Sequence, residues 1–217
     1  SILEWDQPNA SHATIKRREG RMTSPRGAVP ALGAAILLNL PLGSLYAFSL
    51  FLEPLQQALG AGRGEVSAVF SLATVAFTAA MLLTPYTYGR ARPGILALLG
   101  CALGAAGLAV AAFASSVVTA ALGYGLMFGA ASGIGYSVAL QAVNRAMPDR
   151  RGLATGIAVA AYGAGAVLFA PLFRLALGEM GLAGTFLALA ALLLAAGMVA
   201  AVLLGHTGVR FDTGGAE

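Results

Sequence analysis

Six long apolar blocks constrain the fold of this chain more than any other feature. As a helix rising 1.5 Å per residue, each block reaches roughly 30 Å, the thickness of the hydrocarbon core of a bilayer. The blocks carry no charged stripe, which a soluble helical bundle would need, and they do not alternate with the period of a membrane β-barrel. The sequence therefore predicts an all-α membrane protein with six transmembrane helices, at about residues 28–57, 66–88, 94–114, 117–142, 153–176 and 182–205.

The low charge content excludes most soluble functions. Only 10% of the 217 residues are charged, which is too few to coat a water-facing surface, whereas a soluble domain has about 25%. An ordinary soluble enzyme is therefore excluded, and so is a nucleic-acid-binding protein, despite the net charge of +4. The single cysteine, Cys101, excludes a disulfide framework and a cysteine-based metal site.

The chain divides into a polar N-terminal tail (1–27), a six-helix transmembrane domain (28–205) and a polar C-terminal tail (206–217). We expect the basic N-terminal tail to be disordered, because it holds no apolar run longer than Ile2-Leu3. It does not fit a signal peptide, since the apolar block behind it is too long for an h-region. Met22 begins a plausible short tail of its own, so residues 1–21 are either upstream sequence or a native extension.

The connections between the blocks carry the charges that orient the domain. Of the 13 Lys and Arg residues, eleven lie on one side: five in the N-terminal tail, two in the second loop, three in the fourth loop and one in the C-terminal tail. The other side holds Arg63 and Arg174. The positive-inside rule therefore predicts that both termini are cytoplasmic, and an even number of spans agrees with their lying on one side.

One short motif occurs twice, with its two copies about 90 residues apart. Gly43 to Tyr46 in the first block (Gly-Ser-Leu-Tyr) matches Gly133 to Tyr136 in the fourth (Gly-Ile-Gly-Tyr). An offset of three spans puts the two copies in opposite orientation, as in the inverted three-plus-three repeats of transporters. In a chain so rich in Ala and Gly, matches this short also arise by chance.

Glycines recur every four residues along the fourth and fifth blocks. Gly125, Gly129 and Gly133 form one row, and Gly152 and Gly156 begin another. Small residues at this spacing let helix backbones approach closely within a membrane. We interpret both rows as helix-packing faces, and the alternative is that such contacts also let the helices slide and rock.

Three tyrosines lie well inside predicted spans. Tyr46, Tyr136 and Tyr162 fall in the first, fourth and fifth blocks, where a phenol needs a hydrogen-bond partner or water. Asn39 falls at similar depth near Pro41. It either lines a central cavity together with the three tyrosines or satisfies backbone groups that the proline leaves unpaired. Other tyrosines near span ends fit the interfacial aromatic belt: Tyr86, Tyr88 and Tyr124.

Groups that catalyse reactions or bind metals are missing from the middle of the predicted spans. No Lys, Arg, His, Asp or Glu lies at mid-span, and no nucleophile–base pair, metal-ligand cluster or phosphate-binding loop occurs. Glu53 and Arg174 lie near span ends, where they are solvated, and the alternatives are a proton-coupling carboxylate and an anion-attracting cation. We therefore expect no enzyme activity, no cofactor and no bound metal.

Two stretches of the chain resemble a known family. Leu42 to Phe51 (Leu-Gly-Ser-Leu-Tyr-Ala-Phe-Ser-Leu-Phe), with Pro54-Leu55 after it, is similar to the first helix of oxalate/formate antiporter-like transporters. Gly123 to Tyr136 and the run Met147 to Ala158, which contains Pro-Asp-Arg-Arg-Gly-Leu-Ala-Thr-Gly, resemble the region of the fourth and fifth helices in that group. The monocarboxylate transporters share the Pro-Asp-Arg-Arg-Gly pattern, and both groups belong to the major facilitator superfamily.

The loop between the second and third blocks matches this superfamily in part. Family members carry Gly-x-x-x-Asp-Arg-x-Gly-Arg there, and the acidic residue helps to hold a charge network that stabilises one state of the cycle. Tyr86 stands at the position of that acid, so the resemblance does not extend to the network. The resemblance still implies a two-part cytoplasmic-loop motif: Gly89, Arg90 and Arg92, with Asp149, Arg150 and Arg151.

The resemblance implies a fold and a function. Family members have twelve spans in two six-span halves, and this chain is similar to the N-terminal half. It would then move a small carboxylate (formate, oxalate or a monocarboxylate) by alternating access in a bacterial inner membrane. A second six-helix half would come from another chain, a homodimer or a continuation of this chain. The substrate-cavity candidates are Tyr46, Tyr136, Tyr162 and Asn39, because the N-terminal half of the family contributes aromatic and polar residues there.

Two other hypotheses remain open from the sequence. One hypothesis is that the chain is a non-transporting accessory or scaffold subunit of a larger membrane complex. The other is that it is a truncated product without a function. Tyr86 at the position of the family's acid and the lack of charge at mid-span fit the scaffold hypothesis. Co-purification separates them, because a scaffold comes with a large unrelated complex and a half-transporter with a second six-span chain.

Overall fold

The computed structural model describes residues 25–207 and Phe211, and the structural statements below concern those residues. They are almost entirely helical, without a strand. The predicted tails at 1–27 and 206–217 lie mostly outside the described residues. The helices are α2 (Pro25–Gly43), η1 (Ser44–Leu50), α3 (Leu52–Leu59), α4 (Arg63–Leu83), η2 (Thr84–Thr87), α5 (Pro93–Ala112), α6 (Val117–Ala120), η3 (Ala121–Phe128), α7 (Gly129–Ala146), η4 (Pro148–Arg150) and α8 (Arg151–His206).

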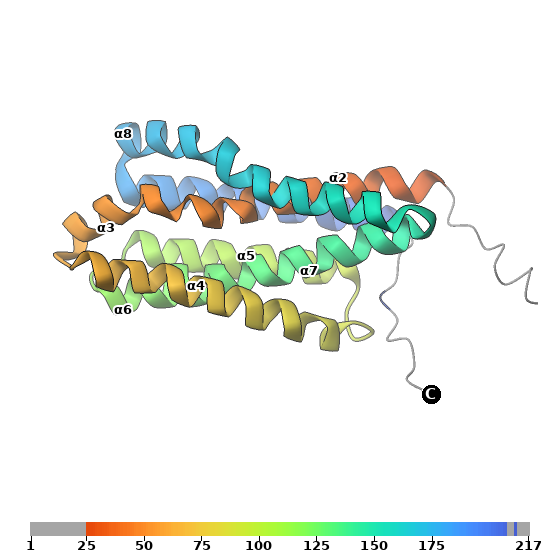
Figure 1. Cartoon of the computed structure of the whole chain (residues 1–217), viewed down its shortest axis with the longest axis horizontal. Helices are drawn as coiled ribbons and strands as arrows, with labels where there is room; N and C mark the ends of the chain where they lie inside the picture. Colours follow the sequence, from red (N-terminus) through yellow and green to blue (C-terminus); the bar gives the residue numbers. More distant parts are fainter. Residues whose placement is uncertain (1–24, 208–210, 212–217) are drawn as a thin grey trace, which may run out of the picture.

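The long element α8 contains two antiparallel arms. Gly181 has φ 67° and ψ −171°, a conformation that residues with a side chain rarely adopt. The chain reverses there, so that residues 151–180 (the first arm) and 182–206 (the second arm) run in opposite directions (Figure 1). Five helical stretches of the described chain are long and apolar enough to cross a membrane, and the last of them holds both arms. The prediction of six spans in an all-α membrane fold is therefore confirmed.

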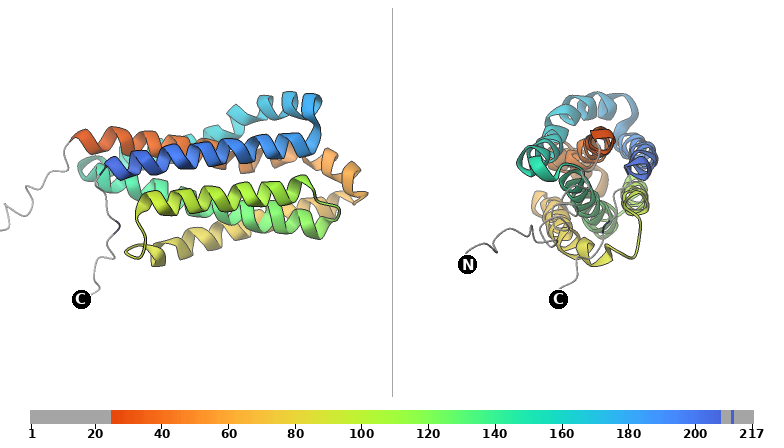
Figure 2. Two further views of the ribbon diagram at one scale, coloured as in Figure 1. Left: turned by 180° about the vertical axis from the view of Figure 1, so that it is seen from behind. Right: turned by 90° about the vertical axis from the view of Figure 1, so that its right-hand side faces the viewer.

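The arms form an elongated bundle in which the first and last described helices share one end. The start of α2 and the end of α8 lie at the same end of the bundle (Figure 1). A Cβ atom added to Gly27 would lie 3.3 Å from the carbonyl oxygen of Thr207, which shows how close the ends are. The second arm of α8 runs between α2 and α5, as the view from behind shows (Figure 2). The predicted placement of both termini on one side of the membrane agrees with this arrangement.

The two copies of the recurring motif occupy matching places in the bundle. A Cβ atom on Gly43 of the first span would lie 2.8 Å from the carbonyl carbon of Tyr162 in the fifth. A Cβ atom on Gly133 of the fourth span would lie 3.0 Å from the backbone nitrogen of Met81 in the second. Exchanging spans one to three for spans four to six converts the first contact into the second, which favours the inverted-repeat interpretation.

Small residues also set the contact between α5 and the second arm of α8. A Cβ atom on Gly197 would lie 2.6 Å from the Cβ atom of Cys101, whose side chain is fully buried. A Cβ atom on Gly94 would lie 2.7 Å from the carbonyl oxygen of Ala201. These helices therefore pack backbone against backbone, as glycine-rich membrane helices do.

The fourth span departs from regular α geometry near its start. The Ser116 hydroxyl oxygen accepts a hydrogen bond from the Thr119 N–H at 3.2 Å and caps α6. η3 follows as an eight-residue π-helix before α7 begins at Gly129. Such wide turns are rare and frequently occur at functional sites. Here η3 carries Tyr124 into the core, where its side chain is only 1% exposed.

Candidate functional site

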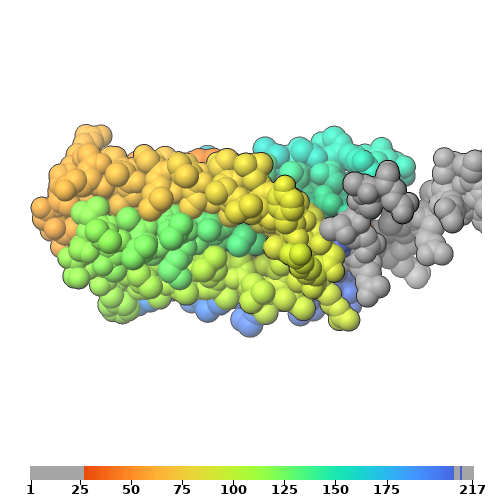
Figure 3. Space-filling model, turned by 90° about the horizontal axis from the view of Figure 1, so that it is seen from below, coloured from red at the N-terminus to blue at the C-terminus, as the bar shows by residue number. Residues whose placement is uncertain are grey.

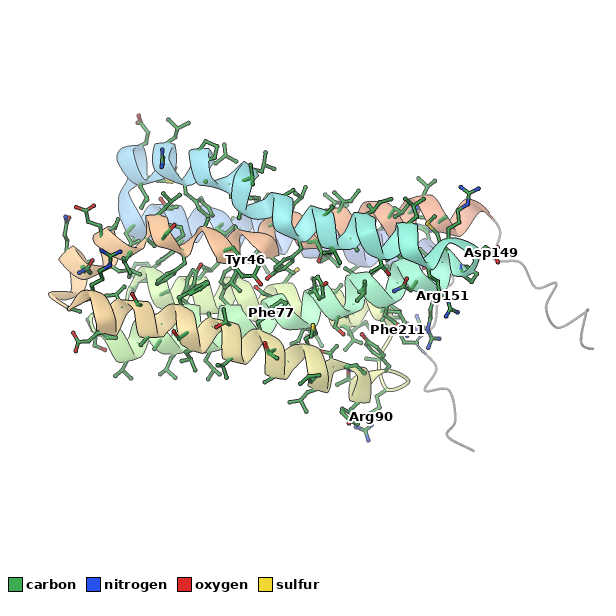
Figure 4. All side chains as sticks on the ribbon, in the orientation of Figure 1. Tyr46, Phe77, Arg90, Asp149, Arg151 and Phe211 are labelled. Atoms are coloured by element: carbon green, nitrogen blue, oxygen red, sulfur yellow. The ribbon has the colours of Figure 1, made fainter. Side chains whose placement is uncertain are left out.

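Three tyrosines predicted from the sequence meet midway along the bundle. The ring of Tyr162 lies 5.8 Å from that of Tyr46 and 5.2 Å from that of Tyr136, both edge to face. Phe77 of α4 completes the group, with its ring 5.7 Å from Tyr136 and 5.6 Å from Tyr162. We call these four residues the tyrosine cluster. It joins the first, second, fourth and fifth spans, and Figure 4 shows Tyr46 and Phe77 near the middle of the bundle.

The tyrosine cluster runs from the protein surface into the interior. Tyr46 is 51% exposed, Tyr136 is partly buried and Tyr162 is only 4% exposed. The Tyr162 hydroxyl has no hydrogen-bond partner of adequate geometry among the described residues. The nearby Ser132 hydroxyl donates its own proton to the Phe128 carbonyl at 2.9 Å, and its oxygen does not accept a hydrogen bond from the Tyr162 hydroxyl. The O–H group of the buried Tyr162 thus has no acceptor among the described residues, and it belongs to a cluster whose Tyr46 ring is half exposed.

Asn39 lies at a helix crossing next to the tyrosine cluster. Its side chain is fully buried, and its Nδ2 donates a hydrogen bond to the Ala158 carbonyl at 2.8 Å. Ala158 precedes Tyr162 by one helical turn, so Asn39 ties the first span to the fifth beside the cluster. The Asn39 Oδ1 has no partner among the described residues. Near Pro41, it is Ser44 Oγ and not Asn39 that donates a hydrogen bond to the Pro41 carbonyl, at 2.6 Å.

Two further tyrosines do not lie where the sequence placed them. Tyr124 and Tyr88 are 1% and 7% exposed, so their interpretation as interfacial belt residues is wrong. The Tyr124 hydroxyl donates to the Leu45 carbonyl at 3.3 Å, and its ring packs among phenylalanines.

Phe77 is a member of the cluster that sequence reasoning missed. Its spacing of seven residues from Phe70, two turns along one helix face, was the available signal.

A stripe of hydroxyl side chains borders the tyrosine cluster along α4. Ser71 and Thr78 are exposed, each directly after a phenylalanine that faces the cluster (Phe70 and Phe77). The hydroxyls of Thr74 and Thr78 donate to carbonyls of the preceding turn at 2.8 and 2.9 Å. Figure 3 shows α4 along the surface of the bundle, and only 22% of its most apolar window is buried. The hydroxyl stripe therefore faces outward beside the cluster.

The two predicted glycine rows meet different surroundings. A Cβ atom on Gly129 would lie 2.8 Å from the Cα atom of Ala73, and one on Gly125 would lie 3.1 Å from the Val69 carbonyl oxygen. This row, which Gly133 continues, packs the fourth span against α4. Gly152 and Gly156, by contrast, are exposed, and a Cβ atom there would meet nothing within 4 Å. Their predicted packing role has no partner within the described chain and stays a prediction.

The predicted loop motif lies at the end of the bundle that carries the chain ends. Gly89 has φ 86°, which explains a glycine at this turn. Figure 4 shows Arg90 on the opposite side of this end from Asp149 and Arg151. Arg92 and Arg150 are exposed like these three, and no ion pair joins the six motif residues within the described chain. The structure thus does not bring the two parts of the motif together.

The described residues contain no group of three His, Cys, Asp or Glu side chains that could hold a metal ion. The tyrosine cluster contains no charged group. Its chemistry is limited to aromatic surface and hydroxyl hydrogen bonds, which suit binding and orientation of a small polar molecule.

Comparison with known proteins agrees with the fold. A profile described as Major Facilitator Superfamily matches residues 32–212. The chain is 31% identical over 154 residues to the oxalate:formate antiporter of Oxalobacter formigenes, which is 71% of this chain and 37% of that protein. It is 31% identical over 170 residues to monocarboxylate transporter 11 of Mus musculus, which is 77% of this chain and 38% of that protein.

The human monocarboxylate transporter 11 matches over a shorter stretch, with 36% identity over 104 residues, 48% of this chain and 22% of that protein. The chain thus spans less than two fifths of the length of the curated relatives it matches. The resemblance seen in the sequence, including its branch, is confirmed. Six membrane-length helical arms and a profile match over most of the sequence show that this chain belongs to the Major Facilitator Superfamily.

Proposed function

We propose that the chain is the N-terminal half of a secondary transporter that moves a small carboxylate by alternating access with a second six-helix half. The observation that carries this proposal is the tyrosine cluster, in which rings from three other spans surround the buried Tyr162 phenol, whose hydroxyl has no partner among the described residues. Two matched relatives are named for carboxylate substrates, which supports the substrate class. Both are more than twice as long as the matched stretch, which supports the need for a second half.

The surroundings of the tyrosine cluster support a protein partner on that face. The exposed hydroxyls of α4 donate to carbonyls of their own helix, and their oxygens remain able to accept hydrogen bonds from water or from another helix. The hydroxyl stripe of α4 lies on one side of the cluster. Gly152 and Gly156 lie on the first arm of α8, which carries Tyr162. A second half that docks on both would enclose the cluster between the halves, with the outer faces left to the lipid bilayer.

The residues of the cluster would bind a carboxylate without a charge of their own. The Tyr162 hydroxyl would donate to a carboxylate oxygen, and Tyr46, half exposed, would contact the substrate from the open side. A carboxylate is costly to desolvate without a cation. The compensating positive charge would come from the second half. The carboxylate would cross the membrane without any covalent step. Both termini would be cytoplasmic, in a bacterial inner membrane.

Reconstitution tests this proposal. The chain is purified from its native membrane in nanodiscs, and mass spectrometry identifies what accompanies it. We expect a second six-span chain or a longer form of this chain, and expect proteoliposomes of that preparation to exchange labelled formate, oxalate or lactate. The Tyr162→Phe variant, purified identically, is the matched control. A preparation that contains both halves but neither binds nor exchanges any small carboxylate would contradict the proposal.

A scaffold role is the second candidate, because the open glycine row would suit any helical partner. It predicts stoichiometric recovery with a large, unrelated membrane complex. In that case substitutions at Gly156 would disrupt co-purification, whereas Tyr162→Phe would change nothing that can be measured.

A further inference from the structure

Phe211 is buried at the end of the bundle that carries the chain ends. It lies beyond the last helix, yet its side chain is only 2% exposed. Its ring packs against that of Tyr88 with centroids 4.5 Å apart, and the Arg145 guanidinium carbon lies 5.8 Å from the ring centroid. Figure 4 shows Phe211 at this end of the bundle. One ring thus contacts both the loop between α4 and α5 and the last turn of α7.

Tyr88 is itself fixed to α7. Its hydroxyl makes a hydrogen bond of 2.8 Å with the Ser137 hydroxyl, and its side chain is 7% exposed. Burial raises the pKa of the Tyr88 phenol, while the hydrogen bond with Ser137 and the charge of Arg145 act in the opposite direction. The phenol therefore stays neutral at physiological pH. Tyr86, in the same loop, is 74% exposed, so of the two tyrosines in this loop the one that meets Phe211 is the buried one.

The backbone hydrogen bonds inside the loop do not reach α7. Tyr88 donates to the Pro85 carbonyl and Arg90 to the Thr87 carbonyl, each at 3.1 Å, and all four residues belong to the same turn. The loop meets α7 through η2, in which Thr84 is buried, and through the Tyr88 side chain. Of these contacts, the Tyr88 ring is the one that Phe211 covers.

We propose that Phe211 is a detachable aromatic clasp, which holds the loop between α4 and α5 against α7 through Tyr88 and Arg145 and releases the loop when its ring leaves. Burial of one phenylalanine ring favours the docked state by a factor on the order of ten to a hundred. A preference of this size leaves a minor released state that other contacts can populate. A movement that separates the loop from α7 has to break the Tyr88–Ser137 hydrogen bond and the packing of the Phe211 ring on either Tyr88 or Arg145.

The aromatic clasp concerns this end of the bundle alone and holds whatever the chain transports. Its readout is the mobility of the loop rather than substrate exchange. A negative result would therefore leave the proposed function untouched, and failure of carboxylate exchange would leave the clasp untouched.

Hydrogen exchange on the full chain in nanodiscs tests the clasp, because exchange reports how often backbone amides open. The peptide that covers residues 84–92 is followed by mass spectrometry in the wild type and in Phe211→Ala. We expect its protected amides to exchange about tenfold or more faster in the variant. The matched control is Tyr86→Ala, which removes an exposed aromatic side chain from the same loop and should change the rate less than twofold. The thermal unfolding midpoint of each variant verifies that the bundle is intact.

Two further variants keep the test decisive. Phe211→Leu retains apolar volume and should accelerate exchange in the same peptide by a smaller factor, even if Phe211→Ala fails to fold. The double variant Phe211→Ala with Tyr88→Ala should exchange no faster than the faster single variant, because both changes break one contact. The clasp would be overturned by an unchanged rate in both Phe211 variants, by equal acceleration in Tyr86→Ala, or by multiplied accelerations in the double variant.

Discussion

Tyr162 and Tyr124 are both buried, but their hydroxyls differ in what they contact. The Tyr162 hydroxyl has no partner among the described residues, whereas that of Tyr124 donates to the Leu45 carbonyl. Natural proteins satisfy most buried polar groups, so an unpartnered donor at a ring cluster calls for an explanation. A ligand that completes the hydrogen bond is the explanation that the proposed function supplies.

Substitution of each of these two tyrosines by phenylalanine distinguishes a hydroxyl that binds a ligand from one that stabilises the fold. Tyr162→Phe should leave the free energy of unfolding within about 0.5 kcal/mol of the wild type, since no protein hydrogen bond is lost. It should weaken carboxylate binding by about 10- to 100-fold, the value of a hydrogen bond to a charged group. Tyr124→Phe should lower stability by about 1 kcal/mol and leave substrate affinity unchanged. Thermal unfolding and equilibrium binding of labelled carboxylate check both. The opposite pattern would assign Tyr162 a structural role.

At the scale of helices, the same glycine spacing serves two environments. Gly129 packs against the backbone of Ala73, and Gly156 meets open space. In Gly129→Ala the new methyl would lie 2.5 Å from the Ala73 carbonyl oxygen, so α4 and α7 must separate. We expect a loss of about 1–3 kcal/mol in stability, as for other overpacked sites. Gly156→Ala should gain up to about 1 kcal/mol from helix propensity in the isolated chain.

A larger side chain at Gly156 tests what lies outside the chain. Gly156→Leu should leave the unfolding midpoint of the purified chain unchanged, because Gly156 is exposed and no described atom lies within 4 Å of a Cβ atom there. It should reduce recovery of the second half during co-purification, because a bulky residue keeps helix backbones apart. Equal destabilisation by Gly129→Ala and Gly156→Ala would show that both rows pack inside the bundle.

These contrasts show where sequence reasoning succeeds and where it stops. Apolar length determines the spans because the bilayer has a fixed thickness, so the six arms were predictable. Spacing determines which residues share a helix face, but not what that face contacts. Hence Gly129 and Gly156 looked alike, and Tyr124 resembled a belt residue. The break between the last two arms was expected near residues 176–182, but either Gly178 or Gly181 could have adopted the left-handed conformation.

For the tyrosine cluster, the sequence supplied three of the four rings and not their arrangement. Tyr46, Tyr136 and Tyr162 stood out because phenols are costly at mid-span. Phe77 carried no such signal, since phenylalanine is ordinary in an apolar helix. The unpartnered state of the Tyr162 hydroxyl depends on how its O–H lies relative to the surrounding acceptors, which only the packed structure determines.

At the scale of the whole molecule, the shared position of the chain ends makes the orientation testable. The ends lie opposite the turn between α3 and α4 (Figure 1). The excess of Lys and Arg on the side of the ends predicts that this side faces the cytoplasm. A protease site inserted at Gly60 should be cut by protease added to spheroplasts, whose outer membrane has been opened, and one inserted at Gly89 only after the inner membrane is permeabilised. The reverse pattern would invert the assigned orientation.

The burial of Cys101 has a practical consequence. It is the single cysteine of this sequence, its side chain has no exposed surface, and it packs against Gly197 in the contact between α5 and the second arm of α8. A maleimide cannot reach that thiol while the bundle is folded. The natural chain therefore serves as its own unreactive background, and a thiol placed on any exposed face would be the one group that such a reagent modifies. Reaction at Cys101 would in turn report that α5 and the second arm have parted.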